Sequence, residues 1–315
     1  MTSRHAHVDE RRPDADPPGR WRELVLLAVA MVLAMTTWFS ASAVLPQLRA
    51  EWSLSNTAAS WLTIAVQLGF VAGALVSATL NLADLIAPRR LVLVGALGAA
   101  ISNLGLLVAG GAAFAIPVRF ATGAFLALVY PPALKAMSTW FRSGRGLALG
   151  VMVGALTLGS AMPHLVNGIG GARWRVVVVV TSIATAAGGV IAELATSDGP
   201  FPFPRGVFRP SQVADTIRHR GIRLASLGYF GHMWELYAMW AWFAAFYADT
   251  LTLDGGSASA TTVSLVTFAV IGSGAVGCVV GGVLGDRWGR TRTTAAALMI
   301  SGTCAMTIGF LRHGG

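Results

Sequence analysis

The sequence predicts an all-α, polytopic membrane protein, a bundle of helices that cross the bilayer repeatedly. Its 315 residues are 55% hydrophobic and only 12% charged, whereas soluble domains carry about 25% charged residues. The apolar residues are gathered into long runs that polar loops separate. Both cysteines, Cys278 and Cys304, lie inside such runs, which excludes a disulfide scaffold. These observations exclude an ordinary water-soluble enzyme and a disordered chain.

Nine apolar runs follow a polar tail, residues 1–20, in which no secretory signal peptide is evident. Each run has about 18–25 residues, enough for a helix to cross roughly 30 Å of hydrocarbon. The runs are Leu24–Leu45, Ala58–Leu82, Leu91–Ala109, Ala113–Met137, Leu147–Gly168, Val176–Leu194, Leu224–Phe246, Thr261–Leu284 and Thr294–Leu311.

The charges of the loops predict the orientation of the chain. Of the 23 Lys and Arg residues, 17 lie in the N-terminal tail and in every second loop after it, and 4 lie in the remaining segments. The positive-inside rule then places the N-terminus in the cytoplasm, and we expect the protein in the cell membrane. Because the basic residues are spread over short loops, they do not indicate a nucleic-acid partner.

The longest connection divides the chain into six runs and three. We expect a cytoplasmic tail, residues 1–20, a six-helix bundle, residues 21–195, a central cytoplasmic loop, residues 196–223, and three further helices, residues 224–315. The second and eighth runs end alike, each with an aspartate followed by arginines. These aspartates, Asp84 and Asp286, are 202 residues apart, and an internal repeat of this kind is typical of transporters.

The second of these loops carries a specific resemblance. The pattern Gly282-x-Leu284-x-Asp286-Arg287-x-Gly289-Arg290-x-Arg292 resembles the signature loop of the major facilitator superfamily. The first copy keeps Asp84, Arg89 and Arg90 but lacks the glycines, and Arg119-Phe-Ala-Thr-Gly123 is similar to a fourth-helix motif of the family.

The resemblance implies a secondary transporter with two six-helix halves that work by alternating access. This chain would then hold a complete first half and three helices of the second, so we expect a truncated product; a functional nine-helix variant is the alternative. The resemblance also implies that the two loops latch the outward-open state. The latch residues would be Asp84, Arg89, Arg90, Gly282, Asp286, Arg287, Gly289, Arg290 and Arg292.

Two basic residues lie within the fourth run. A central Arg costs roughly 2.5–3.5 kcal/mol on insertion scales, so we expect Arg119 to face a cavity or a partner. It would bind an anionic substrate or couple to protons; alternatively it pairs with helix carbonyls or extends outward to the membrane interface. Lys135 lies near the inner end, where its long side chain can reach the headgroups.

Further candidates for substrate binding or coupling are His232, Glu235 and Tyr237 on the seventh run and His164 on the fifth. The spacing of His232 and Glu235 puts them on one helix face. Glu235 would carry a proton or be a counter-charge to Arg119, with a buried structural pair as the alternative. His164 is a candidate for substrate binding or coupling; alternatively, it only packs against neighbouring helices.

The sequence contains no Walker-type loop, no His-Glu-x-x-His motif and no Cys/His cluster. We therefore predict no enzyme activity, no cofactor and no metal. The expected partners are the lipid bilayer, a small-molecule substrate and protons, with a small organic anion as the favoured substrate. Efflux of hydrophobic drugs, sugar uptake, a non-transporting remnant or sensor, and an intramembrane enzyme based on His232 and Glu235 stay open. The fifth run lacks the Gly-Pro pair of the antiporter motif, which weakens the drug-efflux alternative.

Overall fold

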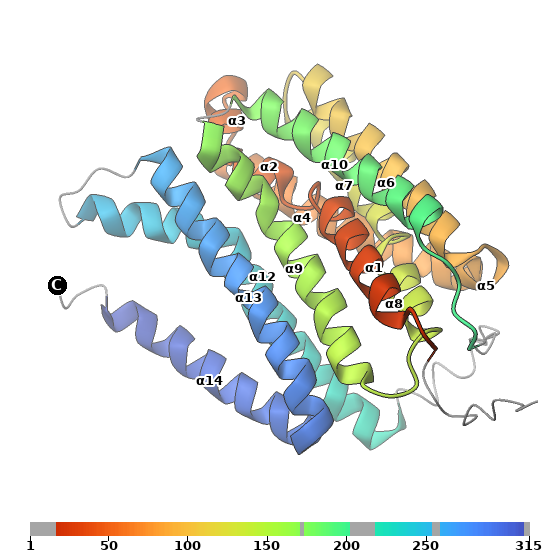
Figure 1. Ribbon diagram of the computed structural model, residues 1–315. Coiled ribbons are helices and arrows are strands. Elements are labelled where there is room, and N and C mark those ends of the chain that lie inside the picture. Colours follow the sequence, from red (N-terminus) through yellow and green to blue (C-terminus); the bar gives the residue numbers. More distant parts are fainter. Residues whose placement is uncertain (1–16, 171–172, 202–217, 254–258, 312–315) are drawn as a thin grey trace, which may run out of the picture.

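The computed structural model describes residues 17–170, 173–201, 218–253 and 259–311 (Figure 1). Within these ranges every regular element is a helix. The elements are α1 (Arg20–Ala34), α2 (Ser40–Ala43), α3 (Leu45–Trp52), α4 (Asn56–Thr79), α5 (Leu82–Leu85), α6 (Pro88–Leu104), the 3-10 helix η1 (Gly105–Val108), α7 (Ala112–Leu126), α8 (Tyr130–Ser138), α9 (Arg145–Gly170), α10 (Trp174–Ala195), α12 (Arg220–Leu253), α13 (Ala260–Trp288) and α14 (Arg290–Leu311).

Among the described residues, six segments are long and apolar enough to cross a membrane, which makes this a multi-pass membrane protein. They are Asn56–Thr79, Pro88–Val108, Ala112–Ser138, Arg145–Ile169, Trp174–Ala195 and Ala260–Trp288. The other three predicted runs form α1 with α2, α12 and α14. Most of the tail and of the central loop, residues 1–16 and 202–217, lies outside the described residues.

Two of the predicted continuous runs are interrupted. In the first run, α1 ends at Ala34 and α2 begins at Ser40, so residues 35–39 form a turn inside the bundle. In the fourth run, a turn at residues 127–129 separates α7 from α8, whose first turn contains Pro131 and Pro132. Pro131 and Pro132 have no N–H to donate to the carbonyls of residues 127 and 128, and proline suits the first turn of a helix, which accounts for the second break.

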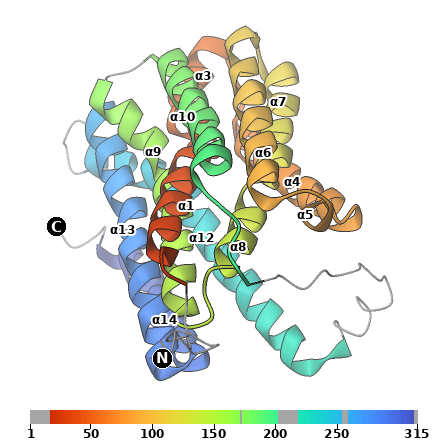
Figure 2. The same ribbon diagram turned by 45° about the vertical axis from the view of Figure 1, so that its right-hand side comes forward.

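The N-terminal helices pack through small residues. In Figure 2, α10 lies between α1 and α6, and it contacts both. Helices α4 and α7 meet at Gly69 and Gly123, where a Cβ atom would lie 1.9 Å from the carbonyl oxygens of Phe120 and Val66, respectively. Small residues permit this close backbone approach, which is a common mode of helix association in membranes.

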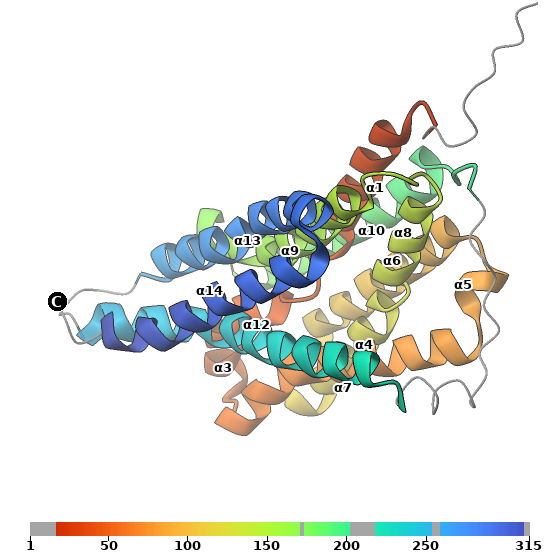
Figure 3. The same cartoon turned by 90° about the horizontal axis from the view of Figure 1, so that it is seen from below.

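The most extensive contact between two helices joins α9 to α13. Figure 1 shows the two helices side by side over nearly their whole length. Figure 3 shows α12 and α14 on one side of this pair, away from α6 and α10. The α9–α13 contact therefore connects the first six predicted spans with the last three.

Candidate functional site

Arg119 lies on α7 with a fully buried side chain. Its Nη1 donates to the carbonyl oxygen of Thr37 at 3.0 Å, to Asn103 Oδ1 at 3.1 Å and to Ser40 Oγ at 3.2 Å. Its Nη2 donates to the carbonyl oxygen of Trp38. The guanidinium thus binds the turn between α1 and α2, whose carbonyls have lost their intrahelical partners.

Asn103, on α6, extends this network to α10. Its Oδ1 also accepts a hydrogen bond from Ser40 Oγ at 2.7 Å. Its Nδ2 donates to Ser182 Oγ at 3.0 Å and to the carbonyl oxygen of Val178 at 3.3 Å. Three helices, α6, α7 and α10, are therefore joined to the α1–α2 turn by the buried guanidinium and neutral polar groups.

The same turn carries two aromatic residues. The Trp38 ring lies 4.8 Å from the Phe70 ring of α4 and 6.3 Å from the Tyr237 ring of α12, measured between centroids. The Phe39 ring meets Trp240 edge-on at 5.5 Å. We call these five residues the aromatic cluster; it contains side chains from both sides of the α9–α13 contact.

The tryptophans of α12 divide by face. Trp240 is only 4% exposed and Tyr237 is half-buried, whereas Trp234 and Trp242 are 82% and 64% exposed. One face of α12 therefore joins the aromatic cluster, and the other face is largely exposed at these two positions.

Glu235 is half-buried and accepts a hydrogen bond from Ser301 Oγ of α14 at 2.7 Å. Within the described ranges no ion pair joins it to His232 or to Arg119, whose polar partners all belong to the N-terminal helices. The structure therefore places the expected counter-charge pair apart.

His164 is buried on α9, and its Nε2 has no hydrogen-bond partner among the described residues. Ser160, one turn earlier on the same face, likewise has a buried hydroxyl without a described partner. Gly159, also on α9, allows this helix to lie close to α1, since a Cβ atom there would be 2.4 Å from the Val32 carbonyl oxygen.

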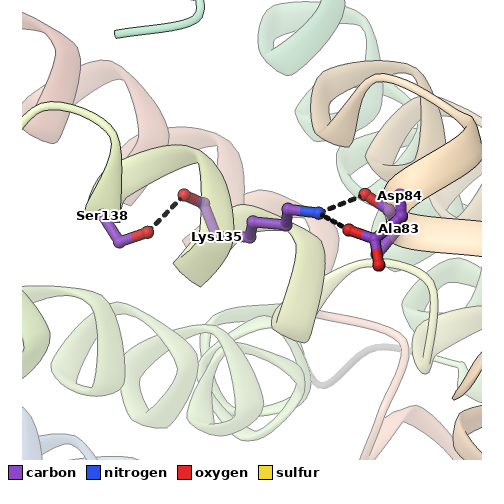
Figure 4. Close-up of polar contacts among 4 residues, drawn as sticks. All are labelled: Ala83, Asp84, Lys135 and Ser138. Atoms are coloured by element: carbon purple, nitrogen blue, oxygen red, sulfur yellow. Dashed lines mark hydrogen bonds and ion pairs between the residues drawn. The ribbon is translucent and has the colours of Figure 1, made fainter. Parts of the chain in front are cut away.

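The first acidic loop is bound within the N-terminal half. Lys135 Nζ of α8 lies 2.5 Å from Asp84 Oδ1 and donates to the carbonyl oxygen of Ala83 (Figure 4). Lys135 is therefore brought together with the predicted latch residue Asp84. Arg90 lies 3.9 Å from Glu193 of α10, and Arg89 Nε is buried without a described hydrogen-bond acceptor.

The second acidic loop binds the start of α9. Asp286 Oδ1 accepts from the backbone N–H of Gly146 at 3.0 Å, and Oδ2 accepts from that of Leu147 at 3.1 Å. A carboxylate at a helix N-terminus satisfies unpaired amides and interacts favourably with the helix dipole. Gly146 and Gly282 allow the approach, because a Cβ atom at Gly282 would lie 2.4 Å from the Gly146 carbonyl oxygen.

The remaining residues of this loop have other positions. Arg287, Arg290 and Arg292 are exposed. Gly289 has a φ of 88° and forms the turn between α13 and α14. A side chain would strain this conformation, which accounts for the glycine.

Residues 27–314 match the sequence profile of the Major Facilitator Superfamily. The chain belongs to this family of transporters. It is 32% identical over 157 residues to the puromycin resistance protein pur8 of Streptomyces alboniger, covering 48% of this chain and 30% of that protein. It is 29% identical over 154 residues to the multidrug efflux pump LfrA of Mycolicibacterium smegmatis, with the same coverage of 48% and 30%.

A third relative, the MFS-type transporter pytF of Aspergillus terreus, is 28% identical over 177 residues, covering 53% of this chain and 55% of that protein. Among solved structures, a bacterial homologue of the human lysosomal transporter Spinster, in an inward-facing and unoccupied conformation, matches with a TM-score of 0.62 and 18% identity. That match covers 87% of this chain and 64% of the other. The matched region thus spans between about a third and two thirds of these proteins.

Four residues of the site in this superfamily member were not singled out from the sequence: Trp38, Phe39, Phe70 and Asn103. An apolar run gives no signal for a break, and Trp38 and Phe39 look like ordinary lipid-facing residues. The available signal was the set of hydroxyl residues at Thr36, Thr37 and Ser40, which are unusual in a span and can satisfy free backbone groups.

Proposed function

We propose that this superfamily member carries a small aromatic solute across the membrane by alternating access, with the aromatic cluster as its binding surface. The observation that carries the proposal is the pairing of Trp38 with Tyr237, and of Phe39 with Trp240, across the two parts of the chain. Ligand pockets are lined mainly by apolar and aromatic side chains, and aromatic rings prefer stacked or edge-on partners.

The geometry favours an uncharged or cationic solute over the small organic anion. Arg119 is fully buried and donates to protein acceptors, and Lys135 lies beside Asp84 at 2.5 Å. Neither is arranged to attract a free anion, whereas aromatic faces attract cations. Two relatives are named for puromycin resistance and multidrug efflux, which supports this choice.

We also propose that transport is coupled to protons through Glu235, with His232 as a further candidate. Glu235 is a half-buried carboxyl group in a membrane helix, with the neutral hydroxyl of Ser301 donating to it at 2.7 Å, and ionisable groups at such positions often mark proton pathways. The contact between Asp286 and the start of α9 would latch the cytoplasmic side, with the N-terminus in the cytoplasm of the cell.

The experiment uses the full chain in proteoliposomes, with ethidium as an aromatic cation and fluorescein as an aromatic anion. We expect ethidium flux and little fluorescein flux. Trp240→Ala should lower ethidium flux about tenfold, because an aromatic contact contributes up to about 1.5 kcal/mol. Trp242→Ala is the matched control; its ring is 64% exposed, and the flux should stay unchanged.

Fluorescein flux without ethidium flux would overturn the proposed substrate class, and equal effects of the two tryptophan substitutions would overturn the role of the aromatic cluster. For coupling, a pH jump should drive ethidium flux in the original chain but not in Glu235→Gln. Ethidium flux that does not change with the pH jump would contradict proton coupling.

A further inference from the structure

Helices α9 and α13 are joined by polar contacts at both ends of their long interface. At one end, Asp286 binds the backbone amides of Gly146 and Leu147; we call this the inner contact. At the other end, Asn167 Nδ2 donates to Ser264 Oγ at 2.8 Å; we call this the outer contact.

Asn167 uses all of its amide group at the outer contact. It is 7% exposed, and its Nδ2 also donates to the carbonyl oxygen of Ala43 at 3.1 Å. Its Oδ1 accepts from Gln47 Nε2 at 3.1 Å. Ala43 is the last residue of α2, where carbonyls lack intrahelical partners. One side chain therefore ties α2, α3 and α9 to α13.

Between the two contacts the backbones of α9 and α13 lie so close together that only glycine fits at the points of contact on α9. A Cβ atom at Gly150 would lie 2.5 Å from the Cys278 carbonyl oxygen, and one at Gly154 would lie 2.9 Å from that of Ala275. Because the two backbones touch at these glycines, we expect the helices to tilt relative to each other about this point more readily than to separate at it. Tilting in one direction opens the inner contact, and tilting in the other opens the outer contact.

We propose that Asn167 and Ser264 form a latch at the outer end, which must break whenever the binding surface opens to the outside. This proposal rests on the alternating-access function proposed above. The inner contact is made by a carboxylate and two amides, and charge-assisted hydrogen bonds are roughly twice as strong as neutral ones. The outer latch is neutral and buried, and its removal shifts the protein toward the outward-open state.

The test measures access to a reporter cysteine from each side of the membrane. Phe268 is suitable, because it lies one turn inward from Ser264 on α13 and packs partly buried against the core. The full chain would carry Phe268→Cys, with Cys278→Ser and Cys304→Ser, in sealed vesicles treated with a membrane-impermeant maleimide. A second preparation with a cysteine at Thr252, exposed at the end of α12, identifies the side that the outer contact faces.

We expect Asn167→Ala and Ser264→Ala each to raise the labelling rate from that side about fivefold, the population change for the loss of one ordinary hydrogen bond. Asp286→Asn should lower the labelling rate from that side. Thr267→Val is the matched control. Thr267 is fully buried on α13, but its hydroxyl donates to the carbonyl oxygen of Val263 in its own helix at 2.7 Å.

Unchanged labelling in Ser264→Ala, with the protein folded by size-exclusion chromatography, overturns the latch. An equal rise in Thr267→Val also overturns it, because general loosening of α13 would then explain the result. Ser264→Ala keeps the test decisive should Asn167→Ala fail to fold. The labelling needs no solute, so an absence of ethidium flux would contradict the proposed function without changing this result.

Discussion

Arg119 shows how a buried cation can be held without an anion. The turn at residues 35–39 frees main-chain carbonyls, and the guanidinium fork binds those of Thr37 and Trp38 together with Asn103. Several planar donors can reach acceptors on different elements, which a lysine ammonium cannot reproduce. The position of Trp38 in the aromatic cluster therefore depends on a residue that does not belong to it.

Arg119→Ala is expected to destabilise the detergent-solubilised protein by about 3 kcal/mol, because it removes hydrogen bonds made by a buried charged group and leaves the Trp38 carbonyl without its described donor. Thermal unfolding would measure the loss. Arg175→Ala provides the comparison. Its side chain is 55% exposed, and its ion pair with Glu51 lies in solvent and should contribute little to stability. Equal losses in both variants would contradict the structural role of Arg119.

Glu51, at the end of α3, gives a pH-dependent prediction. The indole N–H of Trp174 and, more weakly, Arg175 at 2.7 Å hold the pKa of this carboxyl below its usual 4.5, against the opposing effect of partial burial. The folded state therefore binds this proton less tightly than the unfolded chain, and the stabilisation is complete above pH 4.5 and is lost as the pH falls through the lowered pKa.

The thermal stability of the original chain should consequently exceed that of Glu51→Gln at pH 7, and the gap should close as the pH falls below 4.5. Melting curves of the two proteins in matched buffers would measure the difference. A gap that widens on acidification would show that the carboxylate is not stabilised in the folded protein.

At the scale of elements, the glycines of α9 decide how the two parts of the chain meet. Gly146, Gly150 and Gly154 recur every four residues and face α13. On α13, by contrast, Gly277, Gly281 and Gly285 have open space where a side chain would lie. Glycines spaced four residues apart therefore make a close helix contact on α9 but not on α13.

Gly150→Ala should destabilise the protein by about 1–3 kcal/mol, the usual effect of overpacking, because its methyl group would lie 2.5 Å from a backbone oxygen. Gly281→Ala, with nothing within 4 Å of its Cβ atom, should be neutral or slightly stabilising. The melting temperatures of the two variants provide the test, and a larger loss for Gly281→Ala would show that the α9–α13 interface is placed wrongly.

At the scale of the whole molecule, the two repeated loops have diverged in partner. Asp84 binds Lys135 within the N-terminal half, whereas Asp286 reaches across to α9. Both loops lie at the same end of the bundle as the start of α1 (Figure 2). Each loop thus keeps an acid, which serves packing within the N-terminal helices in the first loop and contact between α13 and α9 in the second.

Reporter fusions test this arrangement. Fusions after Arg90 and after Arg292 should both report the cytoplasm, and a fusion after Glu51 should report the opposite side, as the positive-inside rule requires. The measurement compares an enzyme active only in the cytoplasm with one active only outside it. Fusions after Arg90 and Arg292 that report different sides would contradict the repeat.

The sequence predicts the helical fold and one of the acidic loops, and the features that it does not predict each have a physical reason. The apolar runs predict the spans, and the motif around Asp286 predicts the family and the loop. The partners of Asp286 are backbone amides of α9, which leave no trace in residue type. The break in α1 was missed because residues 35–39 contain neither Gly nor Pro. The contact of Asn167 with Ser264 depends on how two distant helices cross, which no local pattern encodes.

The choice of main-chain partners by Asp286 limits how this contact can be lost during evolution. Nearly every amino acid supplies the same amide hydrogen, so replacing the side chain of Leu147 leaves the donor in place. Only proline would remove that donor, whereas a side chain at Gly146, Gly150 or Gly282 would push the two helices apart. Selection on this contact therefore acts on the aspartate and on these small residues, while the side chain of Leu147 can change without loss of the donor.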